Sequence, residues 1–149
     1  MKLAGFDISA SGLTAQRLRM DVIAANIANA ESTRAQYADG KSVPYRRKEV
    51  LLSPASNSFR NLLNEKLNPS GAQGVRVTAI KEDPTPFKTV YNPAHPDADA
   101  DGMVSLPNVD LLKEMVDMIS ATRSYEANVT ALNASKAMFM KSLEIGRGS

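Results

Sequence analysis

Residues 109–149 carry the pattern that most constrains the fold of this chain. Ten positions recur there at alternating spacings of four and three residues, and no Pro or Gly falls between residues 109 and 145. Because an α-helix turns every 3.6 residues, this spacing places all ten side chains on one helix face. It predicts a single helix of about 35 residues, about 52 Å long. The ten positions are Leu111, Met115, Met118, Thr122, Tyr125, Val129, Leu132, Lys136, Phe139 and Leu143.

Capping residues mark the expected ends of this helix. Asn108 or Asp110 can accept hydrogen bonds from its first free N–H groups, and Glu114 lies near the positive end of its dipole. Gly146 and Gly148 are expected to end it.

A second apolar stripe widens this face in the first three turns. Leu112, Val116 and Ile119 form the stripe, and the polar residues Arg123 and Glu126 replace it further along. A helix with two apolar faces needs more than one neighbour, which a chain of 149 residues struggles to supply. The pattern favours burial against a partner chain, and the alternative is that both stripes belong to the core of a monomer.

The first 30 residues carry a seven-residue repeat, which predicts a helix at roughly residues 7–30, about 36 Å long. Near its end, Asn26 and Asn29 either fix the register between packed helices, as buried Asn does in coiled coils, or cap the helix. The apolar members of the repeat are Phe6, Leu13, Met20 and Ile27.

The segment between the two predicted helices has a different pattern. Five of the eight prolines fall within residues 84–107, which excludes a long helix there. Alternating apolar residues predict short strands at 75–79 and 87–91, with weaker candidates at 50–52 and 103–106, and together these suggest a small twisted β module. A short helix is predicted within residues 56–67. The expected class is α+β, with an N-terminal helix in 1–33, a β-rich module in 34–107 and a C-terminal helix in 108–149.

Composition excludes most catalytic and nucleic-acid functions. With no Cys, no Trp and one His, the chain has no disulfide, no thiolate nucleophile and no Cys/His zinc cluster. The net charge of +2 is too small to favour nucleic-acid binding, and we interpret the local run Arg46, Arg47 and Lys48 as a solvated edge. No apolar run reaches the length of a membrane span, and Asp7 and Ser9 interrupt any signal-peptide core, so neither membrane insertion nor a cleaved signal peptide is expected.

One motif resembles a calcium site only in part. Asp97, Asp99, Asp101 and Gly102 match the first six positions of an EF-hand loop, but Asn108 stands where the bidentate Glu is needed. We therefore expect a solvated loop, no metal and no cofactor, and interpret His95 as part of a structural turn. The alternative is a calcium-dependent or hydrolytic protein that uses these residues.

Longer motifs resemble a known family. The stretches Ser11-Gly12-Leu13, Ala15-Gln16-Arg17, Met20-Asp21 and Ala25-Asn26-Ile27-Ala28-Asn29-Ala30 closely resemble the N-terminal signature of flagellar rod and hook proteins, the axial family of the bacterial flagellum. Further stretches resemble a proximal-rod member of that family over almost the whole chain: Pro44-Tyr45-Arg46-Arg47, Tyr91-Asn92-Pro93, His95-Pro96-Asp97, Glu114-Met115-Val116 and Arg123-Ser124-Tyr125-Glu126-Ala127-Asn128. Ala25 departs from the family, which commonly has Asn there, and residues 31–43 also differ.

This resemblance implies a structural subunit of the flagellar basal body, not an enzyme. The terminal helices would pack as a coiled-coil hairpin and bundle with those of neighbours, under a β-rich outer layer, to build a helical rod that crosses the periplasm and transmits torque. The implied partners are copies of this chain, other rod proteins, the membrane ring or an adaptor at the export gate, and the flagellar type III export apparatus. An export adaptor or another self-contained interaction module is the alternative.

The expected interface combines both helices. It comprises Phe6, Leu13, Met20, Asn26, Ile27, Asn29, Leu111, Met115, Met118, Tyr125, Val129, Leu132, Phe139 and Leu143.

Overall fold

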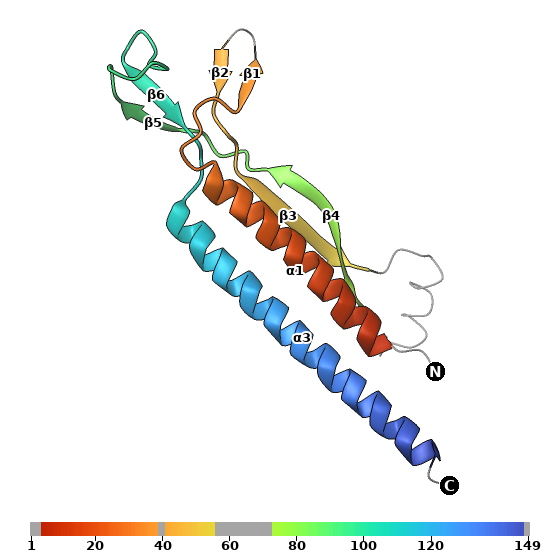
Figure 1. The fold of residues 1–149 in the computed structure, drawn as a ribbon. Helices are drawn as coiled ribbons and strands as arrows, with labels where there is room; N and C mark the ends of the chain where they lie inside the picture. The colour runs from red at the N-terminus through yellow and green to blue at the C-terminus, as the bar shows by residue number, and fades with distance from the viewer. Residues whose placement is uncertain (1–3, 39–40, 56–72, 148–149) are drawn as a thin grey trace. The chain divides into compact units, whose positions relative to one another are not determined.

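The computed structural model describes residues 4–38, 41–55 and 73–147. Within these ranges it has a long helix near each end of the chain and three two-stranded sheets between them (Figure 1), which confirms the α+β class. The elements are α1 (Ala4–Ala28), β1 (Gln36–Ala38), β2 (Lys41–Val43), β3 (Lys48–Pro54), β4 (Val75–Glu82), β5 (Lys88–Tyr91), β6 (Met103–Leu106) and α3 (Leu111–Arg147).

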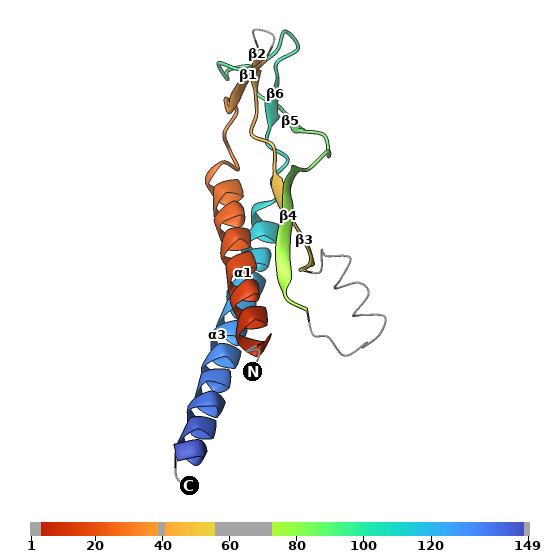
Figure 2. The ribbon, with the colours of Figure 1, turned by 90° about the vertical axis from the view of Figure 1, so that its right-hand side faces the viewer.

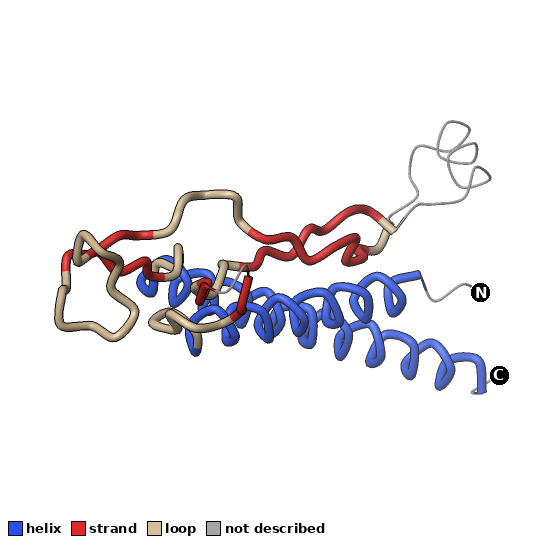
Figure 3. Tube along the Cα trace, turned by 90° about the horizontal axis from the view of Figure 1, so that it is seen from above, coloured by secondary structure: helices blue, strands red, loops and turns tan. Residues whose placement is uncertain are grey.

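The chain divides into two compact units. Unit 1 comprises Met1–Leu18, Leu51–Ala79 and Ala121–Ser149, and unit 2 comprises Arg19–Val50 and Ile80–Ser120. Each long helix contributes one part to each unit: the first part of α1 and the last part of α3 belong to unit 1, and their other parts belong to unit 2. Figure 3 traces both helices as continuous elements.

Helix α1 spans 25 residues and ends where its backbone tightens. The Ala30 N–H bonds to the Ile27 carbonyl three residues earlier, at 3.2 Å, a spacing typical of the last turn of a helix. The Asn29 side chain donates to the Ala25 carbonyl at 2.9 Å, and the same carbonyl accepts from the Asn29 N–H at 3.1 Å, so both bonds hold the last turn of the helix. Of the two roles predicted for Asn29, the structure supports the one at the helix end.

Helix α3 begins at a cap supplied by Asp110. The Asp110 Oδ1 accepts from the N–H groups of Leu112 and Lys113, at 3.1 and 3.4 Å. The helix passes through Gly146 and continues to Arg147, and Gly148, the other glycine expected to end it, lies outside the described residues. A glycine costs an exposed helix only about 1 kcal/mol, and it ends a helix when its backbone turns left-handed; in the described residues that conformation is found at Gly102, with φ of 72°.

The described sheets of the middle segment are pairs of short strands. Strands β1 and β2 pair antiparallel with Gln36 opposite Val43, and β5 and β6 pair antiparallel with Lys88 opposite Leu106 (Figure 2). Strands β3 and β4 form the other pair, in which the Ser53 and Thr78 hydroxyls lie 2.7 Å apart within unit 1.

The strands predicted at 50–52, 75–79, 87–91 and 103–106 are confirmed as β3 to β6. The β1–β2 hairpin was missed because its strands are three residues long and lack an alternating apolar pattern. The predicted small β-rich middle segment is confirmed, and in the described residues it consists of three two-stranded sheets. The short helix predicted at 56–67 lies outside the described residues.

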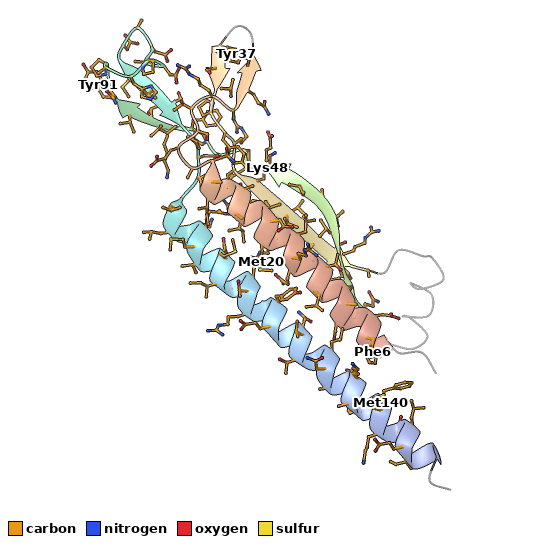
Figure 4. All side chains as sticks on the ribbon, in the orientation of Figure 1. Phe6, Met20, Tyr37, Lys48, Tyr91 and Met140 are labelled. Carbon is orange, nitrogen blue, oxygen red and sulfur yellow. The ribbon has the colours of Figure 1, made fainter. Side chains whose placement is uncertain are left out.

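The apolar core of the described residues is small. Ala15 and Ala121 are buried in unit 1, and Ile23, Val104 and Val109 are buried in unit 2. Large side chains on the hairpins are exposed: Figure 4 labels Tyr37 and Tyr91, which are 79% and 68% exposed. The folded chain therefore leaves much of its apolar surface for other contacts.

The two terminal helices pack together, and small and polar residues lie where they meet. In unit 1, a Cβ added to Gly12 would lie 2.9 Å from the Asn128 Oδ1, and one added to Gly5 would lie 3.7 Å from the Ser135 Oγ. In unit 2, Asn26 of α1 bonds to Glu114 of α3. Each contact pairs an early residue of α1 with a late one of α3, or the reverse, so the helices are antiparallel.

These contacts follow the seven-residue spacing predicted for the N-terminal helix, shifted by one position. Gly5, Gly12 and Asn26 lie immediately before Phe6, Leu13 and Ile27, so the apolar repeat stands about 100° around the helix from the seam. All three apolar side chains are half-buried. This placement explains why the repeat is only partly covered by its own chain.

The seam makes Gly12 irreplaceable by a larger residue. We expect Gly12→Val to lower the free energy of unfolding by about 1–3 kcal/mol more than Gly5→Val, because overpacking costs that much and the Asn128 amide is held by a 2.8 Å bond to the Ser124 carbonyl. Both substitutions make the same change at a glycine of α1, so their difference in urea unfolding reports mainly on packing. Equal losses would contradict the seam.

Candidate functional site

A buried polar cluster, built on Asn26, Arg47, Asn108 and Glu114, is the most connected group of side chains in unit 2 and positions the surfaces around it. The Arg47 guanidinium lies at its centre, 8% exposed. Its Nε donates to the Glu114 Oε1 at 2.6 Å, and its Nη1 donates to the Asp83 Oδ2 at 3.3 Å and to Glu49. The Asp117 Oδ2 lies 3.8 Å from the Nη2. The carboxylates come from α3, β3 and the segment after β4, so one side chain ties three segments together.

Asn26 connects α1 to this cluster and is 1% exposed. Its Nδ2 donates to the Lys48 carbonyl at 2.9 Å and to the Glu114 Oε2 at 3.0 Å. Its Oδ1 accepts from the Lys48 N–H and from the Tyr45 hydroxyl, both at 3.0 Å. Four bonds satisfy the whole amide, which is the condition under which a buried polar residue specifies one packing arrangement.

Asn108 closes the cluster on its other side. Its Oδ1 accepts from the Arg47 N–H at 2.8 Å, and its Nδ2 donates to the Thr85 Oγ1 and carbonyl at 2.9 and 3.1 Å. The role predicted for Asn108 as a helix cap therefore falls to Asp110, because the Asn108 side chain is engaged here.

Hydrogen bonds and charge pairing favour the ionised forms of Arg47 and Asp83 in the cluster. Burial alone would lower the pKa of Arg47, but hydrogen bonds and attraction from Glu114 and Glu49 outweigh it and raise the pKa. The pKa of Asp83 is lowered, first by the Thr85 N–H and hydroxyl and then by Arg47, against the effect of burial. Burial, followed by Glu114 and Glu82, raises the pKa of the Tyr45 phenol and so favours the neutral donor that Asn26 requires.

The interpretation of Arg46, Arg47 and Lys48 as a solvated edge was wrong. Arg47 is buried, and the Arg46 guanidinium lies 4.5 Å from the centre of the Phe87 ring while donating to the Asp83 carbonyl at 3.1 Å. Sequence reasoning missed the cluster because isolated charges suggest surface. The available signal was spacing: Glu114 lies seven residues before the small Ala121, which places both on one helix face, and the structure shows both to be 0% exposed.

The acidic loop is held by protein groups. Asp97 accepts from the Thr33 hydroxyl at 2.9 Å and from the Arg34 Nε at 2.7 Å, and Arg34 lowers the pKa of Asp97. The Asp97 N–H donates to the His95 Nδ1 at 3.1 Å, which makes His95 part of the turn. Across the described ranges, no group of three His, Asp or Glu side chains is arranged to hold a metal ion.

The predicted interface residues fall into two groups. Asn26 is buried and Asn29 is half-buried, as are the apolar repeat of α1 (with Phe6 and Met20 labelled in Figure 4) and Met118, Tyr125, Val129, Leu132 and Phe139 of α3. Leu111, Met115 and Leu143 are exposed by 49%, 51% and 49%. The second stripe is more open still, with Leu112, Val116 and Ile119 exposed by 76%, 66% and 61%.

Neither α1 nor α3, within the described ranges, has the length and hydropathy of a membrane-crossing helix.

Comparison with known proteins agrees with this architecture. Residues 6–36 match the family model of flagella basal body rod proteins, and residues 100–145 match that of the C-terminal part of flagellar basal body rod FlgEFG proteins. The chain is similar to flagellar basal-body rod protein FlgC of Bacillus subtilis, at 56% identity over 95% of both chains. FlgC of Borreliella burgdorferi is 46% identical over 97% of both, and FlgC of Aquifex aeolicus is 45% identical over 93% of this chain and 92% of that one.

Packed terminal helices together with matches at both ends of the chain define a flagellar rod protein. More particularly, the chain belongs to the FlgC family of flagellar basal-body rod proteins. It is a structural, non-enzymatic component of the rod. The polar cluster therefore holds segments of one subunit together through hydrogen bonds and ion pairs.

The cluster predicts that substitutions of Arg47 and Glu114 have non-additive effects on the free energy of unfolding. Arg47→Met leaves the fully buried Glu114 carboxylate without its cation, and we expect it to lower the free energy of unfolding by about 3–5 kcal/mol. Adding Glu114→Gln removes the stranded charge and keeps an acceptor for Asn26, so the double variant should be the more stable of the two in urea unfolding. A double variant as unstable as the sum of both single variants would refute the pairing.

Proposed function

We propose that this chain is a structural subunit of the proximal rod, which assembles helically through its terminal helices and transmits torque from the membrane ring to the distal rod and hook. Membership of the FlgC family supports a rod function, and the exposed apolar stripe of α3 carries the assembly step. Leu112, Val116 and Ile119 lie on one helix face in water, which is costly unless another surface covers them.

The geometry of the proposed contact favours an open assembly. When one face of a subunit binds a different face of the next subunit, the contact can repeat from copy to copy. The repeated contact builds a helical tube, unless the rotation between successive copies closes a ring. Such a tube passes torque through many non-covalent contacts, so each subunit must resist deformation. The satisfied bonds of Asn26 and Arg47 supply that resistance inside unit 2.

The proposed partners follow from the rod function. They are other copies of this chain, other rod proteins, the membrane ring or an adaptor at the rod base, and the flagellar type III apparatus during export without a cleaved signal peptide. We further propose that the helical segments 1–33 and 108–149 lie toward the rod axis and that 34–107 forms an outer layer. The half-buried apolar residues of both helices are the proposed packing interface.

A gene deletion and one substitution test this function. Cells that lack the gene should retain the inner ring but lose rod and hook in electron micrographs of basal bodies, and the intact chain should restore both. Leu132→Asp should fail to restore them, because it places a charge in the proposed packing interface. Asn133→Asp, an isosteric charge at an exposed neighbouring position, should restore swimming.

Two results would contradict the proposal. Complete rods in the deletion strain would show that this chain is not a required rod subunit. They would favour the alternative, an export adaptor. Normal swimming with Leu132→Asp would instead exclude the packing interface while leaving the rod function in place.

A further inference from the structure

Unit 2 contains a groove of about 660 Å³ along one side of α1. Val22 and Ala25 of α1 line it together with Tyr45 and the 49% exposed Ile80. Asp21 and Glu82, both exposed, lie in the same lining with the half-buried Lys48, so two carboxylates and one ammonium group leave the groove with a net negative charge. Its apolar lining and acidic groups suit an apolar helix face flanked by a cation.

Unit 2 also carries a ridge with those properties. Leu112, Val116 and Ile119 are spaced four and three residues apart on α3, which is the spacing of helix residues that anchor in a groove. The exposed Lys113 flanks this ridge. Glu114 and Asp117, the acidic residues on the same turns, are engaged by Arg47 and Arg19. The ridge therefore presents apolar groups with the exposed ammonium group of Lys113 beside them.

One chain cannot bring its own ridge into its own groove. Glu114 faces Asn26 of α1, and at about 100° per residue Val116 points roughly the opposite way from that contact. On α1, Ala25 lies about 100° around the helix from Asn26, and Val22, about 40° from Asn26, is half-buried and still lines the open groove. Each surface stays open after the subunit has folded.

We propose that the ridge of one copy of this chain docks into the groove of the next copy. Apolar complementarity and the opposite charges of Lys113 and of Asp21 and Glu82 support a second copy as the occupant. The inference rests on the proposed rod function and extends it by naming the two faces. Because ridge and groove are different surfaces, the contact is heterologous and leaves one of each free at the ends of a row.

Cysteine cross-linking tests this contact, because the natural chain has no cysteine. Val22→Cys and Val116→Cys place one thiol in the groove and one on the ridge. In basal bodies from swimming cells, the double variant should give disulfide-linked dimers and larger multimers on oxidation, and neither single variant should. Val22→Cys with Thr130→Cys is the matched control, since residue 130 is exposed on α3 about 21 Å further along than residue 116.

Each other result overturns the contact. Cross-linked dimers from a single variant would show that like faces meet, and a link to a protein of another size would show a different occupant. No link in rods that assemble and support swimming would refute this inference alone, whereas complete rods in the gene-deletion strain would refute the proposed function.

A charge exchange provides a second measurement if the cysteine variants fail to assemble. Asp21→Lys should reduce swimming, and adding Lys113→Glu should restore at least half of it, because the pair is then reversed. A double variant that swims no better than Asp21→Lys would contradict docking in this orientation.

Discussion

The carboxylate of Glu114 has no contact with water, and the rest of unit 2 is arranged around keeping it paired. Arg47 supplies its counter-charge at 2.6 Å and Asn26 its second hydrogen bond at 3.0 Å. Arg47 lies between β2 and β3, Asn26 lies on α1, and Glu114 lies on α3. A buried charge with fewer partners would destabilise the fold by several kcal/mol, about the size of a domain's whole stability margin. The three segments therefore have to meet in one arrangement.

Polar and apolar side chains occupy different places in this subunit. The helix seam uses glycine, asparagine and the buried carboxylate of Glu114, which fix the position of the helices. The large apolar side chains stand beside the seam and remain half-buried or exposed. A monomeric protein would bury them in its own core. In a member of a rod family, we propose that these residues contact neighbouring subunits, so that polar contacts define the subunit and apolar contacts join it to others.

The sequence predicted the elements better than the contacts between them. Spacing located both helices and four of the six described strands, because helix and strand periods depend on local pattern alone. It placed Arg47 on a solvated edge and Glu114 at a helix dipole, because burial of a charge depends on partners distant in the chain. Ser11 and Gly12 illustrate the same limit: the motif was visible, but only the structure shows the Ser11 Oγ accepting from the Val75 N–H and Gly12 lying against Asn128.

A cryo-electron microscopy map of the assembled rod, at a resolution that shows side chains, would test the central claim most directly. The account predicts Glu114 bonded to Arg47 and Asn26 of its own subunit, and Leu112, Val116 and Ile119 covered by another subunit. Glu114 paired across a subunit boundary, or the stripe of α3 left in solvent, would contradict the separation of polar fastening from apolar assembly.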